Sequence, residues 1–283
     1  NVTVQGFTLT EGSAANLRIV DSSDVLVTKV TSRLGSGFGI DVSGGSGVRL
    51  EKNAVFGPAL DCIEMDSGSG GVVLGNKITS CGGNGIDVTS PDARVEKNKI
   101  ILADGDGLTL RGGEVAQKNK IDAAGDDGIT TSGAATVVQN KVSSPGEDGI
   151  QVDGNGGRYA SNKVSNAGND CVQITGTGNL FESNKIAGCE DGFEIEGNSN
   201  DFTGNKAQKT TDSGFAVGSN GNEFTGNQAK SLEDGFFVSG SGNVFTSNKS
   251  SSRDEDLRDL NPNDGTNTYV DNRFPTEAFG PLP

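Results

Sequence analysis

Short apolar triplets recur along the chain at nearly constant spacing. Most follow a glycine and place a polar residue between two apolar ones, as in Phe193-Glu-Ile195 within the stretch Asn184–Asn205. The others are Ile40-Asp-Val42, Ile63-Glu-Met65, Ile86-Asp-Val88, Leu108-Thr-Leu110, Ile129-Thr-Thr131, Ile150-Gln-Val152, Val172-Gln-Ile174, Phe215-Ala-Val217 and Phe236-Phe-Val238. Alternation with period two predicts short strands whose outer residues face a core and whose middle residue faces outward.

Asparagine recurs with the same period. The column runs Asn53, Asn76, Asn98, Asn119, Asn140, Asn162, Asn184, Asn205, Asn227, Asn248 and Asn272, and its ten steps average (272 − 53)/10, about 22 residues. An apolar residue stands three positions before each asparagine, and a third strand begins at Lys-Ile or Lys-Val just after most of them. Such a period indicates stacked units, none of which buries its apolar face alone.

Three strands and three turns in about 22 residues predict one coil of a parallel β-helix, an all-β fold. Neighbouring coils lie about 4.8 Å apart, so 11–12 coils give a length on the order of 55 Å. We expect a single domain over residues 1–283. Residues 1–27 form its first coil, without an N-terminal cap, and residues 250–283 form its C-terminal cap.

The repeat resembles the right-handed parallel β-helix, or pectin-lyase-like, superfamily along the full length of the chain. The asparagine column is similar to the asparagine ladder of that superfamily. We expect asparagine here because it tolerates left-handed turns, and because stacked amides can hydrogen-bond from coil to coil. After Asn248 the pattern decays, and we interpret Arg258 as occupying a column that is apolar elsewhere.

Composition narrows the choice of partners. The net charge is 23 − 38 = −15, which argues against binding to nucleic acid or to an anionic membrane. No apolar run approaches membrane-spanning length, so membrane insertion is not expected. We expect a monomer.

A column of acidic residues precedes the triplets. One interpretation is that aspartate forms the tight turn into each strand and accepts backbone N–H groups. The other is that stacked carboxylates repel one another and bind cations, with calcium the natural ion for oxygen-rich sites. The candidate metal ligands are Asp127, Glu147, Asp148, Asp170, Glu190 and Asp191.

A second group of acids is a candidate catalytic site. The outward residues Asp41, Glu64 and Asp87 stand on three successive coils, and Asp61 precedes the middle one. In the pectin-lyase-like superfamily, substrates usually lie along this strand face. A solvated polar face is the alternative interpretation.

The stretch Ser36–Val88 resembles polygalacturonases. Successive coils of that family carry Asn-Thr-Asp-Gly, then Asp-Asp-Cys, then a cysteine ahead of Gly-His-Gly. Here Asp61 matches one catalytic carboxylate, whereas Phe38, Leu60 and Asn84 replace other catalytic residues. Inverting hydrolysis needs an acid and a base on opposite sides of a water, and that familiar set is incomplete. The chain has no histidine, which excludes the His-dependent uronate epimerase pattern.

The four cysteines predict two disulfides. Cys62 and Cys171 each follow a turn aspartate, and a second cysteine comes 19 residues later at Cys81 or 18 residues later at Cys189. That offset places each partner one coil further on, where the turn can bring the pair within reach. The resemblance to polygalacturonases implies the same kind of pairing. Buried free thiols are the alternative; disulfides predict a secreted protein in an oxidising extracellular or periplasmic location.

Two functions remain open at this point. One is a secreted polysaccharide-contacting enzyme, lyase-like or hydrolase-like, and the other is a non-catalytic adhesive or structural rod. The chain has no tryptophan and only two tyrosines, so few aromatic rings are left to stack on sugars. This scarcity favours the non-catalytic rod over the enzyme. A basic side chain from a turn overhanging the acidic patch would favour the enzyme, and a bare ridge would favour the rod.

Overall fold

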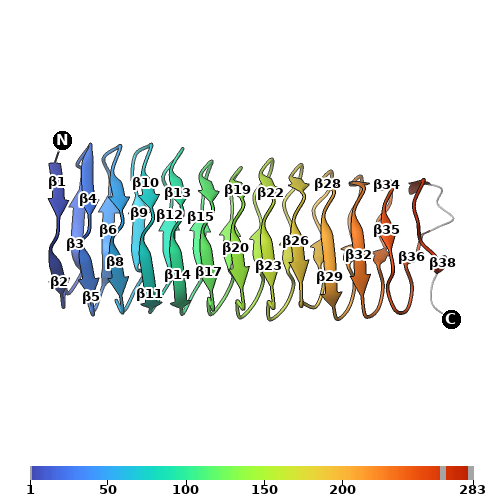
Figure 1. The fold of residues 1–283 in the computed structure, drawn as a ribbon. Coiled ribbons are helices and arrows are strands. Elements are labelled where there is room, and N and C mark those ends of the chain that lie inside the picture. Colours follow the sequence, from blue (N-terminus) through green and yellow to red (C-terminus); the bar gives the residue numbers. More distant parts are fainter. Residues whose placement is uncertain (1, 262–265, 280–283) are drawn as a thin grey trace. The chain divides into compact units, whose positions relative to one another are not determined.

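The fold consists of short parallel strands. The computed structural model describes residues 2–261 and 266–279, and these residues form no helix. No segment among them could therefore cross a membrane as a helix. The chain divides into two compact units, Asn1–Gly146 and Glu147–Pro283. In each unit it passes repeatedly through three parallel sheets, A, B and C, and one passage makes one coil (Figure 1). The predicted all-β parallel β-helix with three strands per coil is confirmed; the single domain stays a prediction.

The first unit holds the earlier coils. Its sheet A contains β1 (Val2–Gln5), β4 (Val25–Thr28), β7 (Arg49–Glu51), β10 (Val72–Leu74), β13 (Arg94–Glu96), β16 (Val115–Gln117) and β19 (Thr136–Val138). Sheet B contains β2 (Thr8–Thr10), β5 (Thr31–Arg33), β8 (Ala54–Phe56), β11 (Lys77–Cys81), β14 (Lys99–Ala103), β17 (Lys120–Asp122) and β20 (Lys141–Ser143). Sheet C contains β3 (Ala15–Val20), β6 (Phe38–Ser43), β9 (Ile63–Asp66), β12 (Ile86–Val88), β15 (Leu108–Leu110) and β18 (Ile129–Thr131).

The second unit has the same three-sheet plan. Its sheet A contains β22 (Arg158–Ala160), β25 (Leu180–Glu182), β28 (Asp201–Thr203), β31 (Glu223–Thr225), β34 (Val244–Thr246) and β37 (Thr268–Val270). Sheet B contains β23 (Lys163–Ser165), β26 (Lys185–Ala187), β29 (Lys206–Thr210), β32 (Gln228–Ser231) and β35 (Lys249–Ser250). Sheet C contains β21 (Ile150–Val152), β24 (Val172–Ile174), β27 (Phe193–Ile195), β30 (Phe215–Val217), β33 (Phe236–Val238), β36 (Leu257–Asp259) and β38 (Glu277–Phe279).

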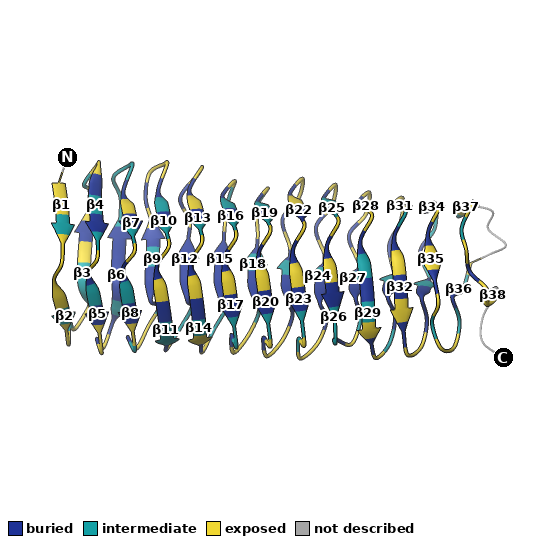
Figure 2. Ribbon diagram, viewed as in Figure 1, coloured by how far each residue is buried: buried dark blue, intermediate teal, exposed yellow. Residues whose placement is uncertain are grey.

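The core of each unit consists of the columns that the alternation predicts. The outer residues of the sheet C triplets are buried, as Figure 2 shows by the blue bands along the strands. The middle residues are less exposed than expected: Asp41, Asp87 and Thr109 are only 8%, 5% and 3% exposed. Neighbouring coils 4.8 Å away cover them, because strands this close leave little room between outward side chains.

The asparagine column forms a buried ladder in the turns between sheets A and B. Asn119 is representative: its Oδ1 accepts the Asn98 N–H at 2.9 Å, and its Nδ2 donates to the Val95 carbonyl at 2.7 Å. One expectation is corrected here. The left-handed conformation belongs to the residue before the asparagine, such as Lys118 with φ 57°, and the asparagine itself satisfies the backbone groups that this turn exposes.

An aromatic ladder fills the core of the second unit. The column on sheet A stacks face to face, with ring centroids 4.7–5.0 Å apart, through Tyr159, Phe181, Phe202, Phe224, Phe245 and Tyr269. Phe193, Phe215 and Phe236 on sheet C form a parallel stack that meets the first edge to face. These rings belong to the core and leave no surface for a sugar.

In the last sheet C triplet, Arg258 does not occupy the inward position predicted for it. Arg258 pairs in register with Phe237 at the outward position of its triplet, whereas Asp259 occupies the inward column of Val238. The Asp259 carboxylate is 1% exposed and accepts hydrogen bonds from the Tyr269 hydroxyl and the Asn261 N–H. These partners allow a carboxylate in the core. Residues 262–265 and 280–283 of the predicted C-terminal cap lie outside the described residues.

Both predicted disulfides are confirmed. Cys62 bonds to Cys81 and Cys171 to Cys189, with Cα atoms 5.4 and 5.5 Å apart. Each bond links a strand entry on sheet C to the end of the next sheet B passage, and so closes one coil.

Candidate active site

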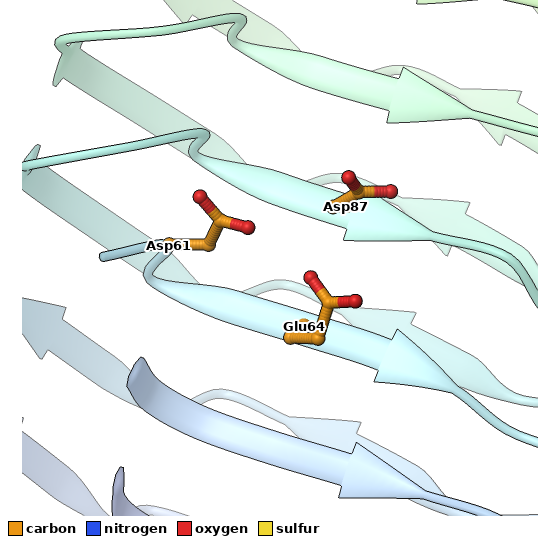
Figure 3. Close-up of side chains that lie close together, drawn as sticks. All are labelled: Asp61, Glu64 and Asp87. Carbon is orange, nitrogen blue, oxygen red and sulfur yellow. The ribbon is translucent and has the colours of Figure 1, made fainter. Parts of the chain in front are cut away.

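Three carboxyl groups meet on sheet C of the first unit. Glu64 on β9 and Asp87 on β12 are partners in register, and Asp61 lies in the turn that enters β9 (Figure 3). One oxygen of each group lies within 4.8 Å of the others. The Asp61 carboxylate also accepts the Asn84 N–H at 2.6 Å, which fixes its position against the next coil. The structure thus brings together three of the four candidate catalytic residues.

The fourth candidate, Asp41, is the outward residue of the preceding coil on sheet C, but it forms an ion pair with a residue outside the cluster. It pairs in register with Glu64 on one side and with Arg18 of β3 on the other. Its Oδ2 lies 2.9 Å from the Arg18 Nε. Asp41 therefore borders the cluster as half of an ion pair.

Arg111 overhangs the other end of the cluster. It lies in the turn after β15, and its Nε and Nη2 donate to the two oxygens of Asp87 at 3.1 and 2.6 Å. Such a two-point contact fixes the orientation of a carboxylate. The hydrogen bond to Asp87 in turn raises the pKa of Arg111.

The electrostatics separate the carboxyl groups into two kinds. Burial, followed by the charge of Asp87 and the hydrogen bond with Asp61, raises the pKa of Glu64 to about 8. Burial also raises the pKa of Asp61. Asp87 carries the compensating ion pair with Arg111. At neutral pH the cluster therefore holds a proton beside a carboxylate whose charge is balanced.

Sequence reasoning missed three residues of this region. Arg18 stands one coil before Asp41 in the same outward column, so the spacing could have identified it. Arg111 lies one residue beyond its triplet, and no periodicity predicts which carboxylate its long side chain reaches. Glu114 follows in the same turn; it is fully buried, its Oε1 has no hydrogen-bond partner among the described residues, and burial raises its pKa.

The repeat matches a known family across nearly the whole chain. A family described as "right handed beta helix region" covers residues 1–144 and 148–276. The chain belongs to the right-handed β-helix family. Together with the three sheets of each unit, this confirms the predicted superfamily and handedness. No curated protein matches this β-helix in sequence.

Solved structures share the fold. The catalytic unit of a GH87 α-1,3-glucanase from Streptomyces thermodiastaticus strain HF3-3 has a TM-score of 0.72 and 16% identity over 96% of this β-helix. The periplasmic alginate epimerase AlgG has a TM-score of 0.61 and 13% identity, covering 96% of this chain and 76% of its own. The Dettilon tailspike protein has a TM-score of 0.58 and 14% identity, covering 95% of this chain and 61% of its own. This β-helix spans 64% of the glucanase catalytic unit.

The candidate metal ligands lie in a different arrangement. In the second unit the Oδ1 of Asp148, Asp170 and Asp191 each accepts a backbone N–H of the next coil, at 2.7–2.9 Å. Asp127 belongs to the equivalent column of the first unit, and the flanking Glu147 and Glu190 are exposed. These contacts match the turn-forming interpretation. Among the described residues, three acids bring their oxygens together only at Asp61, Glu64 and Asp87.

The cluster could serve two chemistries. A proton held by Glu64 beside the Asp87 carboxylate is the combination that general acid–base catalysis requires. Alternatively, oxygens that ligate one calcium at about 2.4 Å lie at most about 4.8 Å apart, so this cluster also fits the ion. The two are exclusive, because calcium needs the carboxyl groups ionised.

Proposed function

We propose that this β-helix binds a polysaccharide along sheet C of the first unit and hydrolyses a glycosidic bond at Asp61, Glu64 and Asp87. One observation carries the proposal: the Glu64 carboxyl group lies within 4.8 Å of Asp87, whose carboxylate is held by Arg111, and burial raises the pKa of Glu64 to about 8. Glycoside hydrolysis commonly uses such a pair of carboxyl groups with different protonation.

The roles follow from the electrostatics. Glu64 donates its proton to the glycosidic oxygen as the bond to the anomeric carbon breaks. The Asp87 carboxylate attacks that carbon and forms a glycosyl-enzyme ester, because carboxyl groups within 4.8 Å have the separation of a retaining pair and leave no room for a water between them. Asp61, hydrogen-bonded to Glu64, holds the acid in place. A water then hydrolyses the ester and gives its proton to the Glu64 carboxylate, so the Asp87 carboxylate and the Glu64 acid are both regenerated.

Hydrolysis fits the residues better than elimination. A lyase needs a base that removes a carbon-bound proton, and Arg18 and Arg111 are the basic side chains at the cluster. Both already form ion pairs with carboxylates of the site, and the hydrogen bond to Asp87 raises the pKa of Arg111, which makes it a poorer base. The overhanging Arg111 also makes the site different from the bare ridge expected of a structural rod.

The structural neighbours support contact with polysaccharide. Two of them are an α-1,3-glucanase and an alginate epimerase, and a third is a tailspike protein. At 13–16% identity these likenesses establish the fold, and the substrate here follows from the site.

Calcium is the second candidate occupant, favoured by the oxygen separations in the cluster. Asp61, Glu64 and Asp87 would each provide one ligand, and the ion would supply a positive charge for binding hydroxyl or carboxylate groups of a glycan. In that state Glu64 could not act as an acid. A site used for hydrolysis keeps its activity in chelator, whereas a calcium-dependent site loses glycan binding there.

The test is release of reducing ends from a panel of polysaccharides, in chelator and in millimolar calcium. Glu64→Gln and Asp87→Asn should each lower the rate by about 10²-fold or more, as removal of a general acid or a nucleophile does. Asp66→Asn is the matched control, because Asp66 is an exposed carboxylate on the same strand. Full activity in Glu64→Gln would exclude the assigned acid, and new unsaturated ends would show elimination instead.

We propose a secreted location, extracellular or periplasmic. Disulfides persist in oxidising compartments, and each of the two bonds closes a loop of fewer than 20 residues. The chain-entropy relation gives about 3 kcal/mol for each. Thiol titration of the denatured, unreduced protein purified from its source should find no free thiol; four free thiols would contradict this location.

A further inference from the structure

We infer that the polysaccharide bound at this site is uncharged, an inference that rests on the proposed function. The observation behind it is the pairing of cations on sheet C of the first unit. Among the described residues, sheet C and the turns on either side of it in this unit contain two basic side chains, Arg18 and Arg111. Each already binds a carboxylate of the site.

A uronate carboxylate would find no available cation here. Arg111 uses its Nε and Nη2 on both oxygens of Asp87, and the charge of Arg18 is compensated by Asp41 at 2.9 Å. The remaining groups at the cluster are the carboxyls of Asp61 and Glu64. A substrate carboxylate close to them would lose hydration in a partly buried site and gain no ion pair in return.

A cationic sugar does not fit the site either. An ammonium group beside Glu64 would favour the ionised form of that residue, and so would remove the proton needed by the leaving group. An uncharged glycan leaves the shared proton and both ion pairs in place. Further along the column, the outward residues Thr109 and Thr130 are neutral, and their hydroxyls donate to Asp106 and Asp127.

The lysines of the chain do not alter this local balance. In the first unit they begin strands of sheet B, as in Lys77, Lys99, Lys120 and Lys141, or lie in the turns between sheets A and B. A polyanion attracted to them would approach a different sheet from the one that carries the carboxyl cluster.

The experiment compares matched glycans with the same backbone. Neutral α- and β-glucans, mannans and galactans are each offered unmodified, with the primary hydroxyl oxidised to a carboxylate, or with that position aminated. We expect the neutral form of the cleaved backbone to be hydrolysed at least about tenfold faster than either charged form. Higher salt should reduce the gap to the oxidised form.

A variant tests the cause of the preference. Asp41→Asn removes the partner of Arg18, so the rate on the oxidised glycan relative to the neutral one should rise. Asp66→Asn removes the same charge without releasing an arginine and should raise this ratio less. Equal or faster cleavage of the oxidised or aminated form by the native protein would overturn the inference while leaving the proposed hydrolysis intact. No cleavage of any glycan in the panel would overturn both.

Discussion

At the scale of single residues, the candidate site depends on how neighbouring coils divide one proton among several carboxyl groups. Glu64 and Asp87 are equivalent by sequence, since both are outward residues of a triplet. They differ because Arg111 reaches Asp87 and because Asp61 hydrogen-bonds Glu64. The roles of acid and nucleophile therefore come from partners that stand outside the triplet pattern.

The first prediction concerns the pH dependence of hydrolysis. The proposed acid must be protonated, and the pKa of Glu64 is about 8, so kcat/KM should fall as the pH rises through about 8. Initial rates over a range of pH measure this fall. A rate that stays constant between pH 7 and 10 would contradict the assignment of Glu64.

The second prediction concerns the asparagine ladder. Asn119→Ala leaves the Asn98 N–H and the Val95 carbonyl without side-chain partners in a buried turn. Two such groups cost about 2–4 kcal/mol of unfolding free energy, which urea unfolding can measure. Gln117→Ala, an outward substitution on neighbouring β16, is the control and should change stability little. If the two substitutions change the free energy of unfolding equally, the hydrogen bonds of the asparagine ladder do not stabilise the fold more than an ordinary outward side chain does.

At the scale of strands and turns, most of the architecture follows from periodicity. A residue that recurs about every 22 positions occupies one column, so the apolar columns, the asparagine ladder and the disulfides were predictable. A second ladder of Asn179, Asn200, Asn222 and Asn243 in the turns between sheets C and A has the same spacing and was missed. Arg111 was not predictable, because the reach of a long side chain from a turn depends on local geometry.

The third prediction concerns the aromatic ladder of the second unit. Phe202 is fully buried, stacks between Phe181 and Phe224, and meets Phe193 and Phe215 by its edge. Phe202→Ala should lower the free energy of unfolding by about 3–5 kcal/mol, since it removes apolar contacts and leaves a cavity.

The comparison for this variant is Phe56→Ala in the first unit, where the ring is 45% exposed. Chemical unfolding of both proteins gives the two values. We expect a loss below about 1 kcal/mol for Phe56→Ala. Similar losses would mean that stacking adds little to the second unit.

At the scale of the whole molecule, the two units repeat one plan but differ at the position that carries the proposed acid. Each has an aspartate–cysteine pair before a sheet C strand, at Asp61-Cys62 and at Asp170-Cys171. The residue equivalent to Glu64 is Gln173, whose amide donates to Glu194 at 3.0 Å. An amide cannot serve as a general acid, so this position distinguishes the first unit.

The fourth prediction concerns stability and pH. Burial raises the pKa of Glu64 and Asp170 to about 8, of Asp191 to about 7 and of Asp234 to about 6. Unfolded carboxyl groups titrate near 4, so the folded protein binds more protons between about pH 4 and 8. Stability from these groups is fully present below pH 4 and is lost as the pH rises through 6–8.

Urea unfolding at pH 5 and pH 8.5 should therefore show lower stability at the higher pH. Asp170→Asn should reduce this difference, because the amide does not titrate. Asp201→Asn, at an exposed position, should leave it unchanged. A protein that is more stable at pH 8.5 would show that these carboxyl groups are ionised in the folded state.

The aromatic ladder also determines how this protein can be observed in solution. The chain has no tryptophan and two tyrosines, Tyr159 and Tyr269, and both rings stack on phenylalanines of the second unit. Intrinsic tyrosine fluorescence therefore arises in that unit alone, whereas far-ultraviolet circular dichroism records strands in both. If the two signals change at different urea concentrations, the units unfold separately, and the spectroscopist can follow one of them without attaching a label.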